Sequence, residues 1–122
     1  MKDEEGKHEV DLRSRTRAFA LRVIRVYAAL PQTAVAQVLG KQLLRSGTSV
    51  GAHYRGGCRA RSTAELISKF EGGLQELDET SYWLELLMDS GVLPADHLSG
   101  LLDEANQLTA ILTTCVKNAK QR

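Results

Sequence analysis

The sequence predicts an all-α protein, an up-down-up-down antiparallel four-helix bundle formed by one domain of 122 residues. Apolar residues recur at steps of three and four along four separate segments, which is the spacing of one helix face. Proline, glycine and capping signals bound these segments, and the connections between them are short. The chain has two prolines and only 5% aromatic residues, which argues against a β-sandwich.

The first helix is predicted for residues 11–30. Asp11 is a suitable N-cap and Pro31 ends the helix, whereas the polar residues 1–10 are expected to form a disordered leader. The stripe predicted to face the core comprises Leu12, Phe19, Val23, Val26 and Leu30.

The second helix is predicted for residues 34–57, although four glycines fall within residues 47–57. Each glycine weakens an isolated helix by roughly 1 kcal/mol relative to alanine, so tertiary or quaternary packing must hold this helix. A glycine-rich loop is the alternative for this stretch. The predicted inward face comprises Ala36, Leu39, Leu43, Ser46, Val50, His53 and Gly57.

The third helix is predicted for residues 62–90. Ser62 and Glu65 form a capping box at its start, and Gly91 is a suitable C-terminal stop. Its predicted inward stripe comprises Leu66, Phe70, Leu74, Leu77, Ser81, Leu84 and Met88.

The fourth helix is predicted for residues 94–118, with Pro94 in its first turn. The bundle domain therefore covers residues 11–118, and the basic tail 119–122 is expected to fray. The inward stripe of this helix comprises Leu98, Leu101, Ala105, Leu108, Leu112 and Cys115.

Charge is divided between two halves of the chain. Residues 12–64 contain ten Lys or Arg and no Asp or Glu, whereas residues 65–104 contain ten Asp or Glu and one Lys. The formal net charge of +1 therefore conceals a basic half and an acidic half. A basic surface can attract nucleic acid, or it can attract the acidic surface of another copy. Pairing of the two halves within one molecule is the remaining alternative, although ten charges a side are hard to pair internally.

No catalytic, metal or cofactor site is predicted, and the chain is expected not to be an enzyme. The glycine-rich residues 47–57 match neither the P-loop pattern nor the dinucleotide-binding pattern. The three histidines are not spaced as metal ligands, and a di-metal bundle site would need Glu-x-x-His pairs that the chain lacks. Cys58 and Cys115 are expected to be reduced thiols. With no signal-peptide pattern and no apolar stretch of membrane-spanning length, we expect a cytoplasmic protein without a membrane partner.

Side chains around the third helix indicate a contact with another subunit. A helix that faces one core needs only one apolar stripe. Four further residues point away from that stripe, namely Tyr82, Trp83, Leu86 and Leu87. The alternative is that this helix is the most central one of a single molecule. The acidic residues spaced by seven along the helix are expected on the surface. The predicted oligomer interface comprises Tyr82, Trp83, Leu86, Glu71, Asp78 and Glu85.

The basic half also predicts a nucleic-acid surface, because Lys and Arg attract phosphates regardless of base sequence. No aromatic residue interleaves with the arginines except Tyr27 and Tyr54, which are expected to pack internally. Binding would therefore depend on the nucleic-acid backbone or shape. The predicted contacts are Arg13, Arg17, Arg22, Arg25, Arg55, Arg59 and Arg61.

One central segment, residues 45–87, carries a distinctive set of positions: Arg45, Ser46, Ser49, Val50, Ala52, Arg59, Arg61, Ser62, Glu65 and the run Trp83-Leu84-Glu85-Leu86-Leu87. With these positions the segment resembles the bacterial four helix bundle protein family, also called the 23S rRNA-intervening sequence or S23 family. Asp11-Leu12 and Gly91-x-Leu93 fit as well, so the resemblance covers about residues 11–118. The departures are His53 in place of the usual Asn and the glycine pairs Gly56-Gly57 and Gly72-Gly73.

The resemblance implies a bundle that assembles as a homopentameric ring. Some family members are encoded inside rRNA gene insertions, and related accessory proteins of diversity-generating retroelements bind nucleic acid and a reverse transcriptase. We therefore predict a non-enzymatic, self-assembling scaffold or partner-docking module whose subunits join head to tail. The alternative is an RNA-binding accessory protein that uses the basic surface of its first two helices. The expected partners are further copies of the chain, and RNA or an RNA-handling protein.

Overall fold

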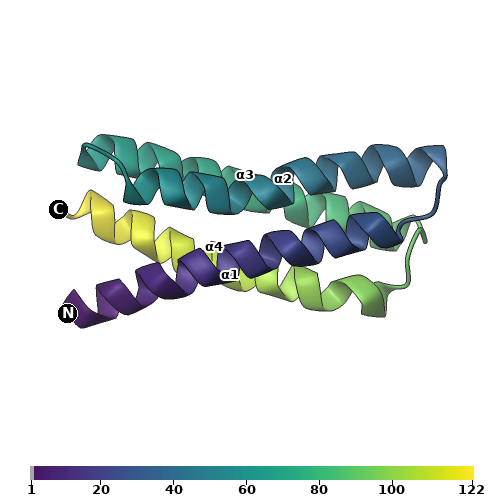
Figure 1. Cartoon of the computed structure of the whole chain (residues 1–122), viewed down its shortest axis with the longest axis horizontal. Coiled ribbons are helices and arrows are strands. Elements are labelled where there is room, and N and C mark those ends of the chain that lie inside the picture. The colour runs from purple at the N-terminus through teal and green to yellow at the C-terminus, as the bar shows by residue number, and fades with distance from the viewer. Residues whose placement is uncertain (1) are drawn as a thin grey trace.

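The computed structural model is a bundle of four antiparallel helices (Figure 1). It describes the backbone of residues 2–122 and the side chains of residues 12–122. No strand occurs among residues 2–122, so the all-α, up-down-up-down prediction is confirmed. Both termini and the α2–α3 connection lie at one end of the bundle, and the other two connections lie at the opposite end (Figure 1). The helices are α1 Lys2–Ala29, α2 Ala34–Cys58, α3 Thr63–Asp89 and α4 Ala95–Lys120.

Helix α1 extends further toward the N-terminus than predicted. It begins at Lys2, and Asp11 lies inside it rather than at its N-cap. No proline occurs between these residues, so nothing in the backbone chemistry forces the helix to begin at Asp11. The prediction of a disordered leader concerns residues 1–10, and the side chains of these residues lie outside the described part of the chain.

The predicted start of α3 is present in detail. Ser62 is the N-cap, and its Oγ accepts a hydrogen bond from the Glu65 backbone N–H over 3.1 Å. The Glu65 carboxylate in turn accepts from the backbone N–H of Arg61 over 3.2 Å. The first bond satisfies a donor that the first turn of a helix otherwise leaves unpaired, and the second ties the residue before the cap to the same turn.

Gly91 ends α3 as predicted. Its φ of 74° lies in the left-handed region that favours glycine. The Gly91 N–H donates to the Met88 carbonyl over 3.1 Å, and the Val92 N–H donates to the Leu87 carbonyl over 3.2 Å. This pair of bonds is the Schellman motif, which closes the helix and turns the chain toward α4.

Helix α2 is continuous through its glycines to Cys58, so the loop alternative for residues 47–57 does not hold. Two of these glycines permit close helix contacts. A Cβ at Gly47 would lie 2.7 Å from a methyl carbon of Val23 on α1, and a Cβ at Gly57 would overlap the Phe70 ring on α3. The helix is therefore held by tertiary packing, as its low intrinsic propensity requires.

The core runs along the bundle axis and largely follows the predicted stripes of α1, α2 and α4. On α3 the buried face is rotated toward α2 and includes Thr80 and Leu87, both with no exposed surface. The Thr80 hydroxyl lies 2.9 Å from that of Ser46 on α2, so the buried oxygens are paired. The buried face of α3 comprises Phe70, Gly73, Glu76, Leu77, Thr80, Leu84 and Leu87.

Candidate functional site

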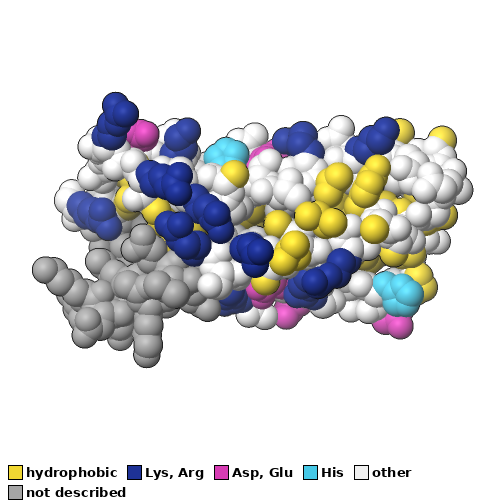
Figure 2. All heavy atoms as spheres, viewed as in Figure 1, with side chains coloured by type: hydrophobic (Ala, Val, Ile, Leu, Met, Phe, Trp, Pro, Cys, Tyr) yellow, Lys and Arg dark blue, Asp and Glu magenta, His cyan; other side chains and the backbone are white. Residues whose placement is uncertain are grey.

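The bundle has two opposite outer faces, one formed by α1 and α2 and the other by α3 and α4. Each helix contacts its neighbours in chain order, and α1 also contacts α4, whereas the described residues of the diagonal pairs do not meet. Figure 2 shows a surface rich in Lys and Arg, which are densest toward the end that carries the termini, with hydrophobic side chains gathered toward the other end. The basic half of the sequence therefore forms one face of the molecule.

Two of the ten basic residues in the basic half pair with the acidic half inside the molecule. Arg15 on α1 holds Glu104 on α4 through two bonds of 2.7 and 3.2 Å. Arg45 on α2 contacts Glu79 at 3.0 Å and Glu76 at 3.4 Å, both on α3. Internal pairing therefore explains only part of the charge division.

The seven arginines predicted to bind nucleic acid form no ion pair with any residue in the range 12–122. They do not form one patch. Arg22 leans toward α4, where its Nη2 lies 3.3 Å from the position of a Cβ on Gly100. Arg59 and Arg61 are exposed at the α2–α3 end, near the last turn of α2 that carries Arg55. The exposed arginines of α1 are Arg17, Arg22 and Arg25, and Arg13 is half-buried.

The two tyrosines near these arginines pack internally, as expected. Tyr54 is 3% exposed and stacks on Phe70 with ring centroids 5.4 Å apart. Tyr27 is half-buried, and its hydroxyl donates to Gln37 over 3.3 Å. Neither ring is therefore free to stack on a base.

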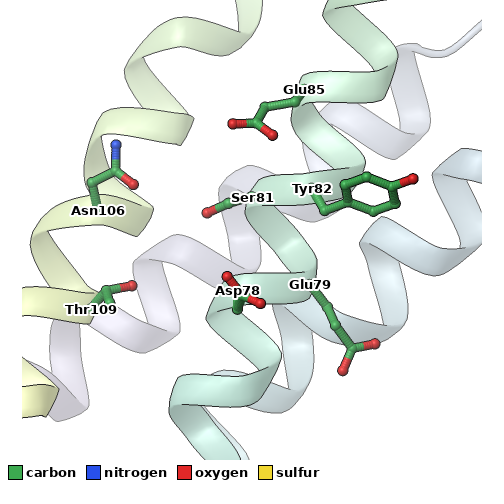
Figure 3. Close-up of a pocket in the computed structure, with 7 residues that line it drawn as sticks. All are labelled: Asp78, Glu79, Ser81, Tyr82, Glu85, Asn106 and Thr109. Atoms are coloured by element: carbon green, nitrogen blue, oxygen red, sulfur yellow. The ribbon is translucent and has the colours of Figure 1, made fainter.

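An acidic groove of about 470 Å³ lies on the opposite face, between α3 and α4 (Figure 3). Asp78, Ser81 and Glu85 of α3 lie on the side toward the polar side chains of α4, while Tyr82 and Glu79 project from the side of α3 that points away from α4 (Figure 3). The groove is lined by Asp78, Glu79, Ser81, Tyr82, Glu85, Asn106 and Thr109. Its carboxylates and its aromatic ring suit a cationic side chain better than an anion.

The groove brings together Asp78, Tyr82 and Glu85, three of the residues predicted for an oligomer interface. Asp78 and Glu85 are exposed and have no ion-pair partner within the described side chains. Glu71 lies further along α3, 3.8 Å from the Lys120 ammonium. Tyr82 is 53% exposed, and Leu86 is half-buried.

Trp83 and Leu87 are placed differently from Tyr82. Leu87 is fully buried in the core of its own molecule, so the expectation that it needs cover from a partner is wrong. Trp83 is half-buried against the same core, and its Nε1–H is buried without an acceptor among the described residues. The rotation of α3 toward α2 explains both placements, because it carries this side of the helix inside.

Four exposed aliphatic side chains were missed by the stripe analysis. Leu21 and Ile24 lie on α1 and are 37% and 43% exposed. Val35 and Val38 lie near the start of α2 and are 57% and 63% exposed. Their positions in the sequence could have identified them, because these apolar residues lie off the stripe that faces the core.

The remaining titratable groups show no assembled reactive centre in the described part of the molecule. No group of three or more His, Cys, Asp or Glu among residues 12–122 is placed to hold a metal ion. His53 is half-buried, with its Nδ1 3.0 Å from the Ser49 carbonyl. Burial, followed by the nearby Cys58, raises the pKa of the Cys115 thiol. None of the helices that the structure describes is long and apolar enough to cross a membrane.

Comparisons with known proteins identify relatives of the fold and of the sequence. The family model of the 23S rRNA-intervening sequence protein matches residues 8–114. The chain is also similar to a crystal structure of a protein of unknown function from the S23 ribosomal protein family of Bacteroides thetaiotaomicron, with 31% identity and a TM-score of 0.85. That match covers 90% of this chain and 98% of the other. No curated protein matches the chain.

Proposed function

The chain belongs to the 23S rRNA-intervening sequence protein family, and we propose that it is a non-enzymatic module whose copies join head to tail into a closed ring. One observation carries this proposal: unpaired charges of opposite sign lie on opposite faces of the same bundle. The α1/α2 face keeps Arg17 and Arg25 without ion pairs among the described residues, and the α3/α4 groove keeps Asp78 and Glu85. Each face therefore complements the other.

Faces on opposite sides of a subunit favour a head-to-tail contact. Such a contact leaves one basic face and one acidic groove free at the ends of every open chain, so growth continues until the rotation closes a ring. The number of five subunits follows from the family resemblance. A ring repeats each remaining surface once per subunit, which raises the avidity for a partner that engages several copies at once. This is the basis for proposing a scaffold or partner-docking role.

Native mass spectrometry of the purified protein tests the proposal. We expect a single species of five subunits that loses subunits as salt rises, because screening weakens contacts between exposed charges. Asp78→Lys combined with Glu85→Lys should give monomers of unchanged helicity. Asp89→Lys combined with Asp103→Lys, which reverses the same number of carboxylates at exposed sites outside the groove lining, is the matched control and should leave the ring intact. A wild-type protein that is monomeric at low salt and high concentration overturns the proposal.

A second function, RNA binding, is favoured by the arginines at the α2–α3 end of the bundle. Arg59 and Arg61 are exposed and form no ion pair in the described structure, and they lie away from the acidic groove. Assembly that uses the outer surface of α1 would leave them free to meet phosphates. This role is compatible with the ring, which would repeat the same basic end in every subunit.

Fluorescence anisotropy with a structured RNA at low salt tests this second function. We expect affinity to fall steeply with salt, because neutralised phosphates release counterions. Arg59→Glu with Arg61→Glu should weaken binding, whereas Lys117→Glu with Lys120→Glu tests the basic C-terminal tail. Binding lost only in the tail variant would move the site to α4, and no binding by the assembled wild type would refute the RNA-binding role.

A further inference from the structure

We infer that the contact between copies is made by the outer stripe of α1, which lies in the acidic groove of the next copy with Leu21 against that copy's Tyr82. This inference rests on the proposed head-to-tail assembly and specifies the two surfaces that meet. The outer stripe of α1 comprises Ser14, Arg17, Leu21, Ile24 and Ala28.

The outer stripe of α1 has the spacing of a second contact face. Its members follow one another at steps of three and four, and all of them are exposed. A helix that packs on one core needs a single apolar stripe, which α1 already supplies through residues such as Phe19 and Val23. Leu21 and Ile24 are therefore apolar side chains that the fold of one molecule does not use. They lie beside each other on one helix face, since residues three apart are neighbours.

Charges flank the apolar centre of the stripe in a regular way. Arg17 precedes Leu21 by four residues and Arg25 follows it by four, so the two arginines are about 12 Å apart along the helix axis. Neither arginine has an ion-pair partner in the range 12–122. By contrast Arg15, on the side of α1 that faces α4, is held by Glu104. Arg17 and Arg25 are thus unpaired charges of α1 that flank Leu21 on its outer surface.

The acidic groove presents the complementary pattern. Asp78 precedes Tyr82 by four residues and Glu85 follows it by three, which places the two carboxylates about 10.5 Å apart along α3. The neighbouring Glu79 already contacts Arg45 at 3.0 Å, so the unpaired carboxylates of the groove are Asp78 and Glu85. Tyr82 is 53% exposed between them and offers an apolar ring with a polar tip.

The two patterns fit each other without a change of backbone. Leu21 on the ring of Tyr82 aligns each arginine with one carboxylate to within about one residue's rise of 1.5 Å. Burial of the leucine and the ring supplies non-directional stabilisation, and the flanking ion pairs fix the register. Because both patterns are nearly symmetric about their centres, α1 can enter the groove parallel or antiparallel to α3. The parallel arrangement pairs Arg17 with Asp78, whereas the antiparallel one pairs Arg17 with Glu85.

Substitution of the apolar centre tests the inference. Leu21→Asp places a like charge beside the carboxylates of the groove and should raise the protein concentration at half-assembly by more than about tenfold, a change of about 1.4 kcal/mol. Val38→Asp is the matched control, because Val38 is more exposed than Leu21 and lies on α2, outside the outer stripe. It should leave assembly unchanged. Sedimentation velocity over a dilution series measures both variants, and circular dichroism confirms that both stay helical.

Cysteine cross-linking identifies the contact directly and gives its direction. In a Cys58→Ser, Cys115→Ser background, Arg17→Cys is combined either with Asp78→Cys or with Glu85→Cys. Because α1 and the groove lie on opposite faces of one molecule, any disulfide between these positions must join two copies. We expect one pair to form a covalent ladder on non-reducing gels and the other to remain monomeric.

The outcomes separate this inference from the proposed function. An oligomeric wild type whose assembly survives Leu21→Asp, with neither cysteine pair cross-linked, overturns the α1 contact and leaves head-to-tail assembly through other residues. A monomeric wild type overturns both. If the protein with Cys58→Ser and Cys115→Ser does not assemble, comparison of Leu21→Asp with Val38→Asp tests the α1 contact without cross-linking.

Discussion

The adjacent glycines Gly56 and Gly57 offer a sharp test of how α2 is held. Both lie in the last turns of the same helix, and replacing either with alanine adds one methyl group. A Cβ on Gly56 would lie 3.4 Å from the flexible Lys69 side chain, an ordinary contact. A Cβ on Gly57 would overlap the ring of Phe70, which is 7% exposed and stacked on Tyr54. The same substitution should therefore change stability in opposite directions.

The magnitude follows from two opposing contributions. Alanine is favoured over glycine in a helix by about 1 kcal/mol, and this gain applies at both positions. Gly56→Ala should therefore stabilise the protein by about 0.5–1 kcal/mol. At Gly57 the gain is opposed by overpacking against a buried ring, which costs about 1–3 kcal/mol. Because the propensity contribution cancels between the two variants, the difference in their unfolding free energies measures the overpacking alone.

Urea unfolding followed by circular dichroism measures this difference. All samples must have one protein concentration, because the assembly that we propose would stabilise the folded state by mass action. We expect Gly57→Ala to be less stable than Gly56→Ala by about 1–3 kcal/mol, with equal dependence on urea. Two variants of equal stability would show that the helix ends before Gly57 or does not lie against Phe70, and would refute this account of the α2–α3 contact.

Two further predictions concern α1 and α4. In a double-mutant cycle, Arg15→Ala and Glu104→Ala should show a coupling energy of about 0.5–1 kcal/mol, because their two-bond contact is only partly exposed. The same cycle at Lys120 and Glu71 should show almost no coupling energy, because these residues lie 3.8 Å apart and are more exposed. Iodoacetamide should alkylate Cys115 more slowly than a free thiol at the same pH, because burial raises the pKa of Cys115 and lowers its thiolate fraction. The alkylation rate should still increase above the ordinary thiol pKa. Equal rates in folded and urea-unfolded protein would contradict this prediction.

The sequence was sufficient for those helix boundaries that have a local chemical cause. Ser62 and Glu65 begin α3 through side-chain bonds to nearby backbone, and Gly91 ends it through its positive φ. The start of α1 was misplaced because Asp11 can cap a helix but can equally lie within one. A cap residue indicates where a helix is able to begin, whereas only a proline or an unfavourable φ compels it to end.

The orientation of α3 was harder to predict because its neighbours decide which side is buried. Ser46 of α2 and Thr80 of α3 share a hydroxyl contact in the core, where the polar Thr80 has no exposed surface. With this rotation Leu87 becomes fully buried and Trp83 partly so, although hydropathy alone assigns them to a second exposed face. A pattern of single residues does not encode such a pair, since each hydroxyl has a carbonyl partner in its own helix and the two meet only when α2 and α3 pack together.

The sequence predicts that charge is divided between two halves of the chain, but it does not predict which charged residues form the two surfaces. The sequence contains Arg15 and Arg17 two residues apart, and nothing in their chemistry distinguishes them. The fold does so, because Arg15 faces α4 and is neutralised by Glu104, whereas Arg17 faces outward among exposed apolar residues. The same distinction separates Glu79, which Arg45 holds, from Asp78 beside it. The charges that remain after the internal pairs are subtracted are those able to meet another molecule, and Arg17, Asp78 and Glu85 are among them, which is why the proposed contact between α1 and the groove rests on the fold and not on the charge count alone.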